Sequence, residues 1–566
     1  MSKAKISALV VLLVVGLAIS VLPAPGVSAG TPKAKLMAGA AALTITPGVV
    51  GEVPVYPDGA PVFLGGYGSW PEPATYIHDD LYARSLVLSY DGKTIVLVVL
   101  DIVGLFWPQV ELIRDEVEGL YGIDRDYVIV ATTHSHASPD TLGLWVYPGF
   151  PGVPPGVNDA YMEYIRERTV ECVGDALGNM VSARISFASA EVPGVMKNTR
   201  DQEEKYAVTY PELEVMKVEA VKKKETIAVM INFAGHPEIL GGGNRHVSTD
   251  FVQYLIGDVE GELGGVALFF NGALGGMITP DVTAPTYAEC ERIGSTIASA
   301  TIEALEDAEV SHDTSISVEK EILTIPLENP LFLGAMLMEL LDRPDYDPTA
   351  GYLGALTSEV DVIKIGETQM ITLPGEALPS IGHRLKEAMT GKYNFVIGLG
   401  NDEIGYIIPQ DEWDWTGTWE NPWTDPDWTG KYEESMSVGP TTAVIVESAL
   451  MEMLSSVVAV GEGRVVVEDP EYSGDATLYI ARVISLKVAG FVYDPAFPWW
   501  MYPVPRPEEW KAPWVQWDII AHRAVKGHRT ELYIGHNEDV GYIVVRIREG
   551  QVTAWGSNVF FSGFVV

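Results

Sequence analysis

Short apolar runs alternate with stretches of helical periodicity between residues 36 and 310. Residues 93–105, KTIVLVVLDIVGL, predict a strand, and residues 108–122, PQVELIRDEVEGLYG, predict a helix. The same order recurs in the apolar runs at 126–136, 225–237 and 264–276 and the helical patterns at 159–177 and 287–307. This alternation predicts an α/β fold, a mixed sheet covered by helices, in which loops after strand ends carry the chemistry.

The pattern continues to about residue 460 and then changes. Residues 359–378 read as two strands that turn into a helix from about Pro379, residues 394–409 as a strand and turn, and residues 441–457 as a last helix. From about 461 the chain has short strand-like runs and Pro/Trp clusters. We therefore expect a large α/β domain over 30–460 and a small β-rich domain over 461–566.

One acidic loop of the larger domain is rich in tryptophan. It contains Trp413, Trp415, Trp419, Trp423 and Trp428. Such a loop is typically packed on itself, but amphipathic rings beside a pocket also suit a gate or an interface.

The first 29 residues have the pattern of a secretory signal. Lys3 and Lys5 precede an uncharged apolar stretch from Ile6 to Leu22, and small residues lead to a cleavage site after Ala29. We expect a secreted or cell-surface protein. An uncleaved N-terminal anchor is the alternative, because the apolar stretch is long for a signal peptide.

The net charge of the chain narrows the classes of expected binding partner. The chain has 77 acidic and 37 basic residues, a formal net charge of −40. Such a surface repels phosphate backbones, so nucleic acid is not an expected partner.

The two cysteines, Cys172 and Cys290, are consistent either with one disulfide or with two buried thiols.

Several polar residues follow apolar runs at the point where Gly or Pro ends the run. His134 and His136 are two apart after DYVIVATT, and on a strand such side chains share a face. His236 lies in NFAGHP, Glu376 in LPGEAL and Tyr406 in GYIIPQ. Nitrogen and oxygen ligands of this kind suit zinc, although spacing alone also allows unrelated loop ends.

Nine motifs resemble, in order, those of the neutral (non-lysosomal) ceramidases. They are FLGGYG, IHDDLYARSLVL, VLDIVG, TTHSHASPD, INFAGHPEIL, VSTDFVQYL, NGALGGMITPD, LPGEALPSIGHRL and GYIIPQDEW. The resemblance spans about 38–458 and implies a zinc amidohydrolase that cleaves the N-acyl bond of sphingoid lipids. It assigns the zinc ligands to His134, His236, Glu376 and Tyr406, and places His136 beside the substrate as a catalytic residue.

The chain departs from this family at one motif. The family's GDVSPN contains a serine thought to act in catalysis, whereas GGMITPD here has none, and Thr279 is the nearest hydroxyl. The resemblance therefore supports hydrolysis by this chain more strongly than it supports specificity for ceramide. The alternatives are a zinc amidase or esterase on another acyl substrate, and an inactive cell-surface binding protein of the same fold.

Five further residues are expected around the site. Asp101 and Asp250 are candidates to orient a ligand histidine by accepting a hydrogen bond from the ring nitrogen that does not bind the metal, or to cap a helix. Arg200, His78 and Tyr67 are candidate substrate contacts. The expected partners are a lipid or other N-acyl small molecule and, through the same surface, a membrane.

Overall fold

The computed structural model describes most of the chain. The described residues are 35–67, 72–145, 157–200, 207–337, 341–350, 353–413 and 432–455, with the strand residues 518–525, 530–537, 541–548, 551–556 and 559–564. The signal expected over 1–29 and four of the five tryptophans at 413–428 lie outside them. The chain divides into two units, Met1–Ala34 and Lys35–Val566, and every element below belongs to the second.

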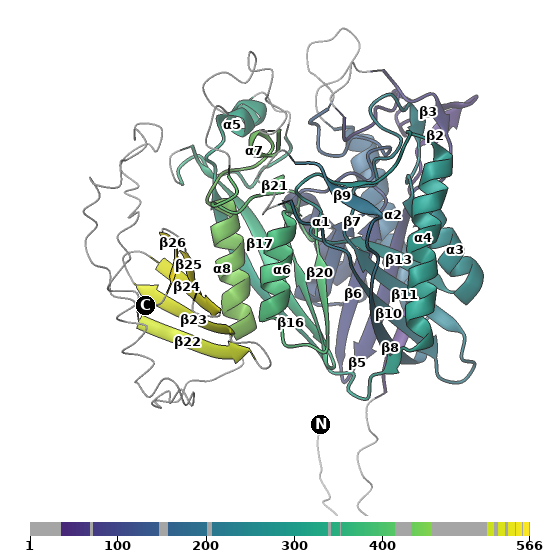
Figure 1. Ribbon diagram of the computed structural model, residues 1–566. Helices are drawn as coiled ribbons and strands as arrows, with labels where there is room; N and C mark the ends of the chain where they lie inside the picture. Colours follow the sequence, from purple (N-terminus) through teal and green to yellow (C-terminus); the bar gives the residue numbers. More distant parts are fainter. Residues whose placement is uncertain are drawn as a thin grey trace, which may run out of the picture. The chain divides into compact units, whose positions relative to one another are not determined.

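A nine-stranded mixed sheet forms the centre of the fold (Figure 1). Its strands are β1 (Met37–Thr44), β5 (Tyr82–Tyr90), β6 (Lys93–Leu100), β7 (Val128–Thr132), β8 (Val181–Glu191), β10 (Glu212–Ala220), β11 (Thr226–Phe233), β13 (Val266–Asn271) and β15 (Glu309–Val310). The order is β13-β11-β10-β8-β1-β5-β6-β7, and β15 pairs with β8. The pairs β6–β7 and β11–β13 are parallel, and the others are antiparallel.

A second sheet packs on one face of the first. It contains β16 (Ile316–Pro326), β17 (Ala355–Ile365), β18 (Thr368–Thr372) and β20 (Tyr393–Ile397), in that order. The core between the sheets joins alternate residues of the large sheet, such as Ile95 and Leu97, to Ile363 and Phe395 of the small one. The period of two along β6 explains why Val96 and Val98 face the opposite side.

Helices cover the two outer faces. On the large sheet these are α1 (Trp107–Tyr121), α2 (Asp159–Gly178), α3 (Val252–Leu263) and α4 (Tyr287–Glu306). On the small sheet they are α6 (Pro379–Ala388) and α8 (Thr442–Ser455). The result is a four-layer arrangement of helices, two sheets and helices, which confirms the predicted α/β class.

The helix ends follow from local sequence. Pro108 lies at the start of α1, and Gly122 ends it in the left-handed conformation (φ 68°). Asn158 and Thr286 cap the starts of α2 and α4 by accepting main-chain N–H groups from residues three positions on. These signals place α1, α2 and α4 within two residues of the predicted helices.

Short elements and loops complete the described structure. They are β2 (Gly48–Val50), β3 (Val53–Val55), β4 (Tyr76–Ile77), β9 (Met196–Asn198), β12 (His246–Val247), β14 (Ile278–Pro280), β19 (Glu376–Ala377), β21 (Tyr406–Ile407), the 3-10 helix Arg125–Tyr127, α5 (Pro330–Leu337) and α7 (Tyr432–Ser435).

The last strands form a separate sheet. These are β22 (Asp518–Val525), β23 (Thr530–Asn537), β24 (Gly541–Arg548), β25 (Gln551–Gly556) and β26 (Val559–Phe564), an antiparallel meander in chain order. The β-rich character expected for this region is present, and the domain boundary at 461 stays a prediction.

Both cysteines are buried free thiols, so the disulfide alternative is wrong for Cys172 and Cys290. None of the described helices is both long enough and apolar enough to cross a membrane.

Candidate metal centre

The large sheet curls so that strands at its two ends meet near their carboxyl ends. Asn271, the last residue of β13, donates from Nδ2 to the carbonyl oxygens of Thr133 and Gly235, each at 3.0 Å. Thr133 follows β7, and Gly235 follows β11, so one amide side chain joins the loops that carry His134 and His236. The loop histidines are therefore brought together by strands that are distant in the sheet order.

His134 lies in the loop after β7 in a left-handed conformation (φ 64°), which is uncommon for a residue with a side chain. It is 2% exposed, and its Nδ1 lies 2.5 Å from the carbonyl oxygen of Val103. A carbonyl oxygen only accepts, so Nδ1 carries the proton and donates. The neutral ring then has its lone pair on Nε2.

His236 is fixed in the same way on the other side. It is fully buried, its main-chain N–H donates to the carbonyl oxygen of Ile278 at 2.9 Å, and its Nδ1 lies 3.0 Å from the same oxygen. The proton is again on Nδ1, and the lone pair of the neutral ring is on Nε2.

Glu376 completes the group from the segment that follows strand β18 of the small sheet. It begins β19, directly after the turn that follows β18, and pairs in parallel with Tyr406 of β21. Its Oε2 lies 2.9 Å from Nε2 of His236 and 3.4 Å from Nε2 of His134. Three acceptor atoms from three separate strand ends thus converge.

Acceptors at these separations require a positive species between them. A zinc ion with ligand bonds of about 2.0–2.1 Å in a tetrahedral set holds its ligand atoms about 3.3 Å apart. The observed 2.9 and 3.4 Å are close to that value. The donor set, nitrogen and carboxylate oxygen without thiolate, suits zinc.

A proton is the other species that can lie between these atoms. Burial lowers the pKa of His236, but the hydrogen bond to Glu376 and the charges of Glu238 and Glu376 outweigh it and raise the pKa to about 9. Burial raises the pKa of Glu376, and the neighbouring His134 and His236 hold it well below its usual range. The site therefore favours an ionised carboxylate facing positive charge.

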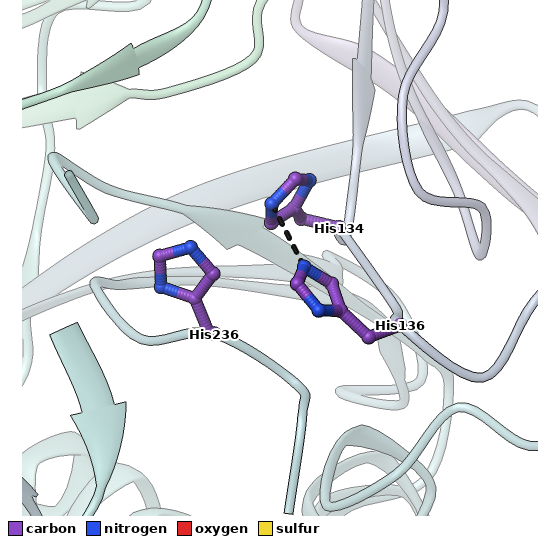
Figure 2. A group of neighbouring side chains, drawn as sticks. All are labelled: His134, His136 and His236. Atoms are coloured by element: carbon purple, nitrogen blue, oxygen red, sulfur yellow. Dashed lines mark hydrogen bonds between the residues drawn. The ribbon is translucent and has the colours of Figure 1, made fainter. Parts of the chain in front are cut away.

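His136 stands beside this group but differs from the other two histidines. Figure 2 shows the three rings turned toward one another, and Nε2 of His136 lies 3.2 Å from Nε2 of His134. The ligand atoms of the three histidines lie within 4.8 Å of one another, a group that can hold a metal ion. No carbonyl orients His136, and among the described residues its buried Nδ1 has no hydrogen-bond partner. Burial first, and then His134 and His236, hold the pKa of His136 well below its usual value.

Tyr406 is a neighbour of the group both through the strand pairing with Glu376 and through its side chain, which hydrogen-bonds to the Glu376 carboxylate. It is buried, and its hydroxyl donates to Sδ of Met277 at 3.3 Å. Burial and the charge of Glu376 raise the pKa of the phenol well above its usual value, so the hydroxyl is neutral. Its assignment as a fourth ligand stays a prediction.

Thr279 is close in sequence to the atoms that fix His236. It lies in β14, next to Ile278 whose carbonyl oxygen accepts from that histidine, and is half-buried. Its catalytic role stays a prediction.

The two aspartates expected behind the histidines hold main chain in the structure. Asp101 Oδ2 accepts the N–H of Tyr82 at 2.9 Å. Asp250 accepts the N–H groups of Leu240 at 3.0 Å and Phe251 at 2.8 Å, close to the start of α3. The carbonyl oxygens of Val103 and Ile278 are the direct acceptors from the two ligand histidines. An orienting role for either aspartate stays a prediction.

The three expected substrate contacts have different environments. Arg200 is buried, with Nη1 paired to Glu433 and Nη2 paired to Glu434. His78 stacks on Tyr287 with ring centroids 3.6 Å apart. Tyr67 alone of the three touches the histidine group, with its ring edge on His136 at 5.1 Å between centroids. A substrate contact by Arg200 would have to compete with its two glutamates.

Sequence reasoning did not identify two residues that organise the site. Asn271 was within the NGALGG motif, but an amide at a strand end has many roles. Glu238 follows His236 by two positions, and its Oε2 lies 3.6 Å from Nδ1 of His136. A carboxylate two positions after a candidate ligand, in GHPE, is the sequence signal that could have identified it.

Comparison with known proteins agrees with this architecture. Residues 52–307 match the family model described as neutral/alkaline non-lysosomal ceramidase, N-terminal. The fold is similar to neutral ceramidase from Pseudomonas aeruginosa, with 18% identity, a TM-score of 0.59, and 75% of this chain and 74% of that chain covered. It is also similar to a ceramidase complexed with C2, with 16% identity, a TM-score of 0.59, and 89% and 85% covered.

Proposed function

We propose, on the premise that the chain is a distant member of the neutral/alkaline ceramidase family, that it hydrolyses the amide bond of ceramide-like N-acyl lipids with the help of zinc. The family match supports ceramide hydrolysis at the level of the family. The observation that carries the zinc proposal is the convergence of Nε2 of His134, Nε2 of His236 and Oε2 of Glu376.

Each residue has a role that follows from its surroundings. His134, His236 and Glu376 hold the ion, because their free lone pairs face one another and their other faces are fixed. Zinc in such a site polarises a carbonyl and makes water acidic enough to attack near neutral pH. His136, which no carbonyl restrains, is the group left to take the proton of the attacking water.

The reaction balances with water as the only co-substrate. The water oxygen bonds to the carbonyl carbon, the carbon–nitrogen bond breaks, and the proton that His136 received passes to the leaving amine. The products are a carboxylic acid and an amine. Thr279 is proposed as a further donor to the substrate or its oxyanion. Tyr67, whose hydroxyl donates to Glu238, is proposed to contact the substrate through its ring.

Ester hydrolysis is the second candidate. The GGMITPD segment has Thr279 where the family motif has serine, and an ester needs less assistance to its leaving group than an amide. We also propose that the protein acts outside the cytoplasm at a lipid surface, on the signal-like pattern of residues 1–29.

A substrate panel with metal analysis tests this function. The purified chain is assayed on N-acyl sphingoid bases, other N-acyl amides, acyl esters and phosphoesters, as isolated, after chelation and after zinc is restored. We expect about one zinc per chain and cleavage of N-acyl amides that is lost on chelation and regained with zinc. Zinc without amide cleavage but with ester cleavage would favour the second candidate. Absence of both zinc and hydrolysis would indicate a binding protein of the same fold.

A further inference from the structure

His136 differs from its two neighbours in what lies behind its ring. The Nδ1 atoms of His134 and His236 lie on main-chain carbonyl oxygens, whereas Nδ1 of His136 faces Oε2 of Glu238 at 3.6 Å. That distance is about half an ångström beyond hydrogen-bond range, as is common before a substrate binds. The two loops are already joined, because the N–H of His136 donates to the carbonyl oxygen of Pro237 at 3.0 Å.

Glu238 is itself held in place by Tyr67. The Tyr67 hydroxyl lies 2.8 Å from Oε2 of Glu238 and 3.0 Å from its carbonyl oxygen. Burial and the charge of Glu238 raise the pKa of Tyr67 well above its usual value, so the phenol remains a donor. The Glu238 side chain is 7% exposed, so water provides little alternative solvation.

The remaining sides of the His136 ring are also enclosed. The edge of Tyr67 packs on it with an interplanar angle of 81°. Gly66 has φ 93°, and a Cβ on this residue would lie 2.3 Å from Cγ of His136. The ring therefore lies directly against the main chain of Gly66, and its place is set by Gly66, Tyr67 and Glu238 together.

We infer that Glu238 is a positioning residue for His136. In the zinc-loaded site, where the Nε2 lone pair of His134 binds the ion and no longer accepts from Nε2 of His136, the Glu238 carboxylate places the imidazole proton of His136 on Nδ1. The lone pair of the neutral ring then lies on Nε2, the atom that faces His134 and the centre of the site. A carboxylate behind a histidine commonly orients the ring and raises its basicity. This inference rests on the proposed function, because it explains how His136 is ready to accept a proton.

A double-mutant cycle separates this role from a merely structural one. Rates are measured for the full zinc-loaded chain, Glu238→Gln, His136→Ala and the double variant on the amide that the panel identifies. We expect Glu238→Gln to lower kcat by about 10- to 100-fold with KM little changed and zinc retained. In the His136→Ala background the same change should cost less than about threefold, because the two residues act as one unit.

The matched control is Glu214→Gln on β10. It removes the charge of a carboxylate whose burial is similar to that of Glu238 and which pairs with Lys386 of α6. We expect its rate to stay within about twofold of the parent. An equal loss on Glu238→Gln with and without His136 would overturn the inference.

A second readout does not depend on activity. Solid-state NMR of the full zinc-loaded chain with ¹⁵N-labelled histidine reports which ring nitrogen carries the proton, and the His136 signals are assigned by their absence in His136→Ala. We expect a proton on Nδ1 of His136, and a mixture of the two tautomers in Glu238→Gln. A proton on Nε2 in the parent would overturn the positioning role even if the zinc site is correct. A parent that binds zinc but hydrolyses no amide would fail the proposed function, and the nitrogen spectrum would still decide the role of Glu238.

Discussion

Nε2 of His236 lies 2.9 Å from Oε2 of Glu376. When the imidazole is neutral, neither atom has a hydrogen of its own to place between them. The Ile278 carbonyl oxygen takes the Nδ1 proton of His236, and an ionised carboxylate only accepts. Nε2 of His134, fixed by Val103, is the third such atom. Three buried acceptor atoms that face one another destabilise the folded state unless a positive species lies between them. This relationship is the basis of the proposed zinc site.

The two histidines of the THSH segment should respond differently to substitution. His134→Ala removes a lone pair that the Val103 carbonyl has fixed, so we expect zinc and activity to be lost together. His136→Ala should keep zinc and lose about 10²- to 10⁴-fold in kcat, the usual cost of an acid/base group. Metal analysis and kinetics on the same preparations measure both effects.

His312→Ala, at an exposed histidine, is the control and should change neither quantity. If His136→Ala emptied the metal site and His134→Ala did not, the two roles would be reversed. Zinc and near-normal turnover in both variants would show that the segment is structural.

Gly66→Ala should displace His136. The added Cβ would lie 2.3 Å from Cγ of His136, and the positive φ of 93° also costs about 1–2 kcal/mol of stability. Gly59→Ala is the matched control, because its φ is 85° and no atom lies within 4 Å of the added carbon.

We expect the two variants to lose similar stability from backbone strain and only Gly66→Ala to lose activity, by about tenfold or more. Thermal melts and initial rates on both proteins test this. Equal activity in the two variants would show that the ring is free to move away.

Asp79 should make stability depend on pH. Burial raises its pKa to about 7 against the hydrogen bonds from Ser248 and Thr249, and nearby Asp101 and Asp250 add to the rise. Between about pH 4 and 7 the folded chain then binds this proton and the unfolded chain does not. The free energy of unfolding therefore falls as pH rises through this window, by about 1.4 kcal/mol per unit at most.

Asp79→Asn removes this titration while it keeps an oxygen acceptor for the Thr249 N–H. The difference in Tm between Asp79→Asn and the parent should shift in favour of the variant from pH 4 to 7 and stay constant above 7. A difference that is independent of pH would mean that Asp79 titrates near its ordinary value.

A chain that ends near residue 460 should still bind zinc, because every proposed ligand precedes that point. It should lose stability or surface attachment if the β22–β26 region contributes either. Zinc content, circular dichroism and vesicle sedimentation of the truncated and full chains measure these effects. Loss of zinc in a truncated chain that remains folded would place part of the site beyond residue 460.

The sequence predicts the fold better than it predicts the geometry of the site. The periodicity of α1, α2 and α4 and the apolar runs of β6, β7, β11 and β13 locate these elements, because burial sets both patterns. The adjacency of His134 and His136 is also correct. Its predicted cause is wrong, because β7 ends at Thr132 and the left-handed turn at His134, not the strand pleat, directs the rings.

Other features of the site leave little or no signal in the sequence. The carbonyl oxygens of Val103 and Ile278 orient the histidines, and a carbonyl is present at every residue. The meeting of His236 with Glu376 depends on two sheets that pack together, which local periodicity does not encode. Only the resemblance to a family grouped these ligands in advance, and that resemblance gave no role to Glu238, although this residue lies within the INFAGHPEIL motif.

X-ray diffraction from crystals of the zinc-loaded protein, recorded on both sides of the zinc absorption edge, tests the central claim most directly. The account predicts one anomalous peak about 2.0–2.2 Å from Nε2 of His134, Nε2 of His236 and Oε2 of Glu376. A zinc-loaded crystal with no peak among these three atoms, or with a peak bound by His136 but not by Glu376, would contradict it.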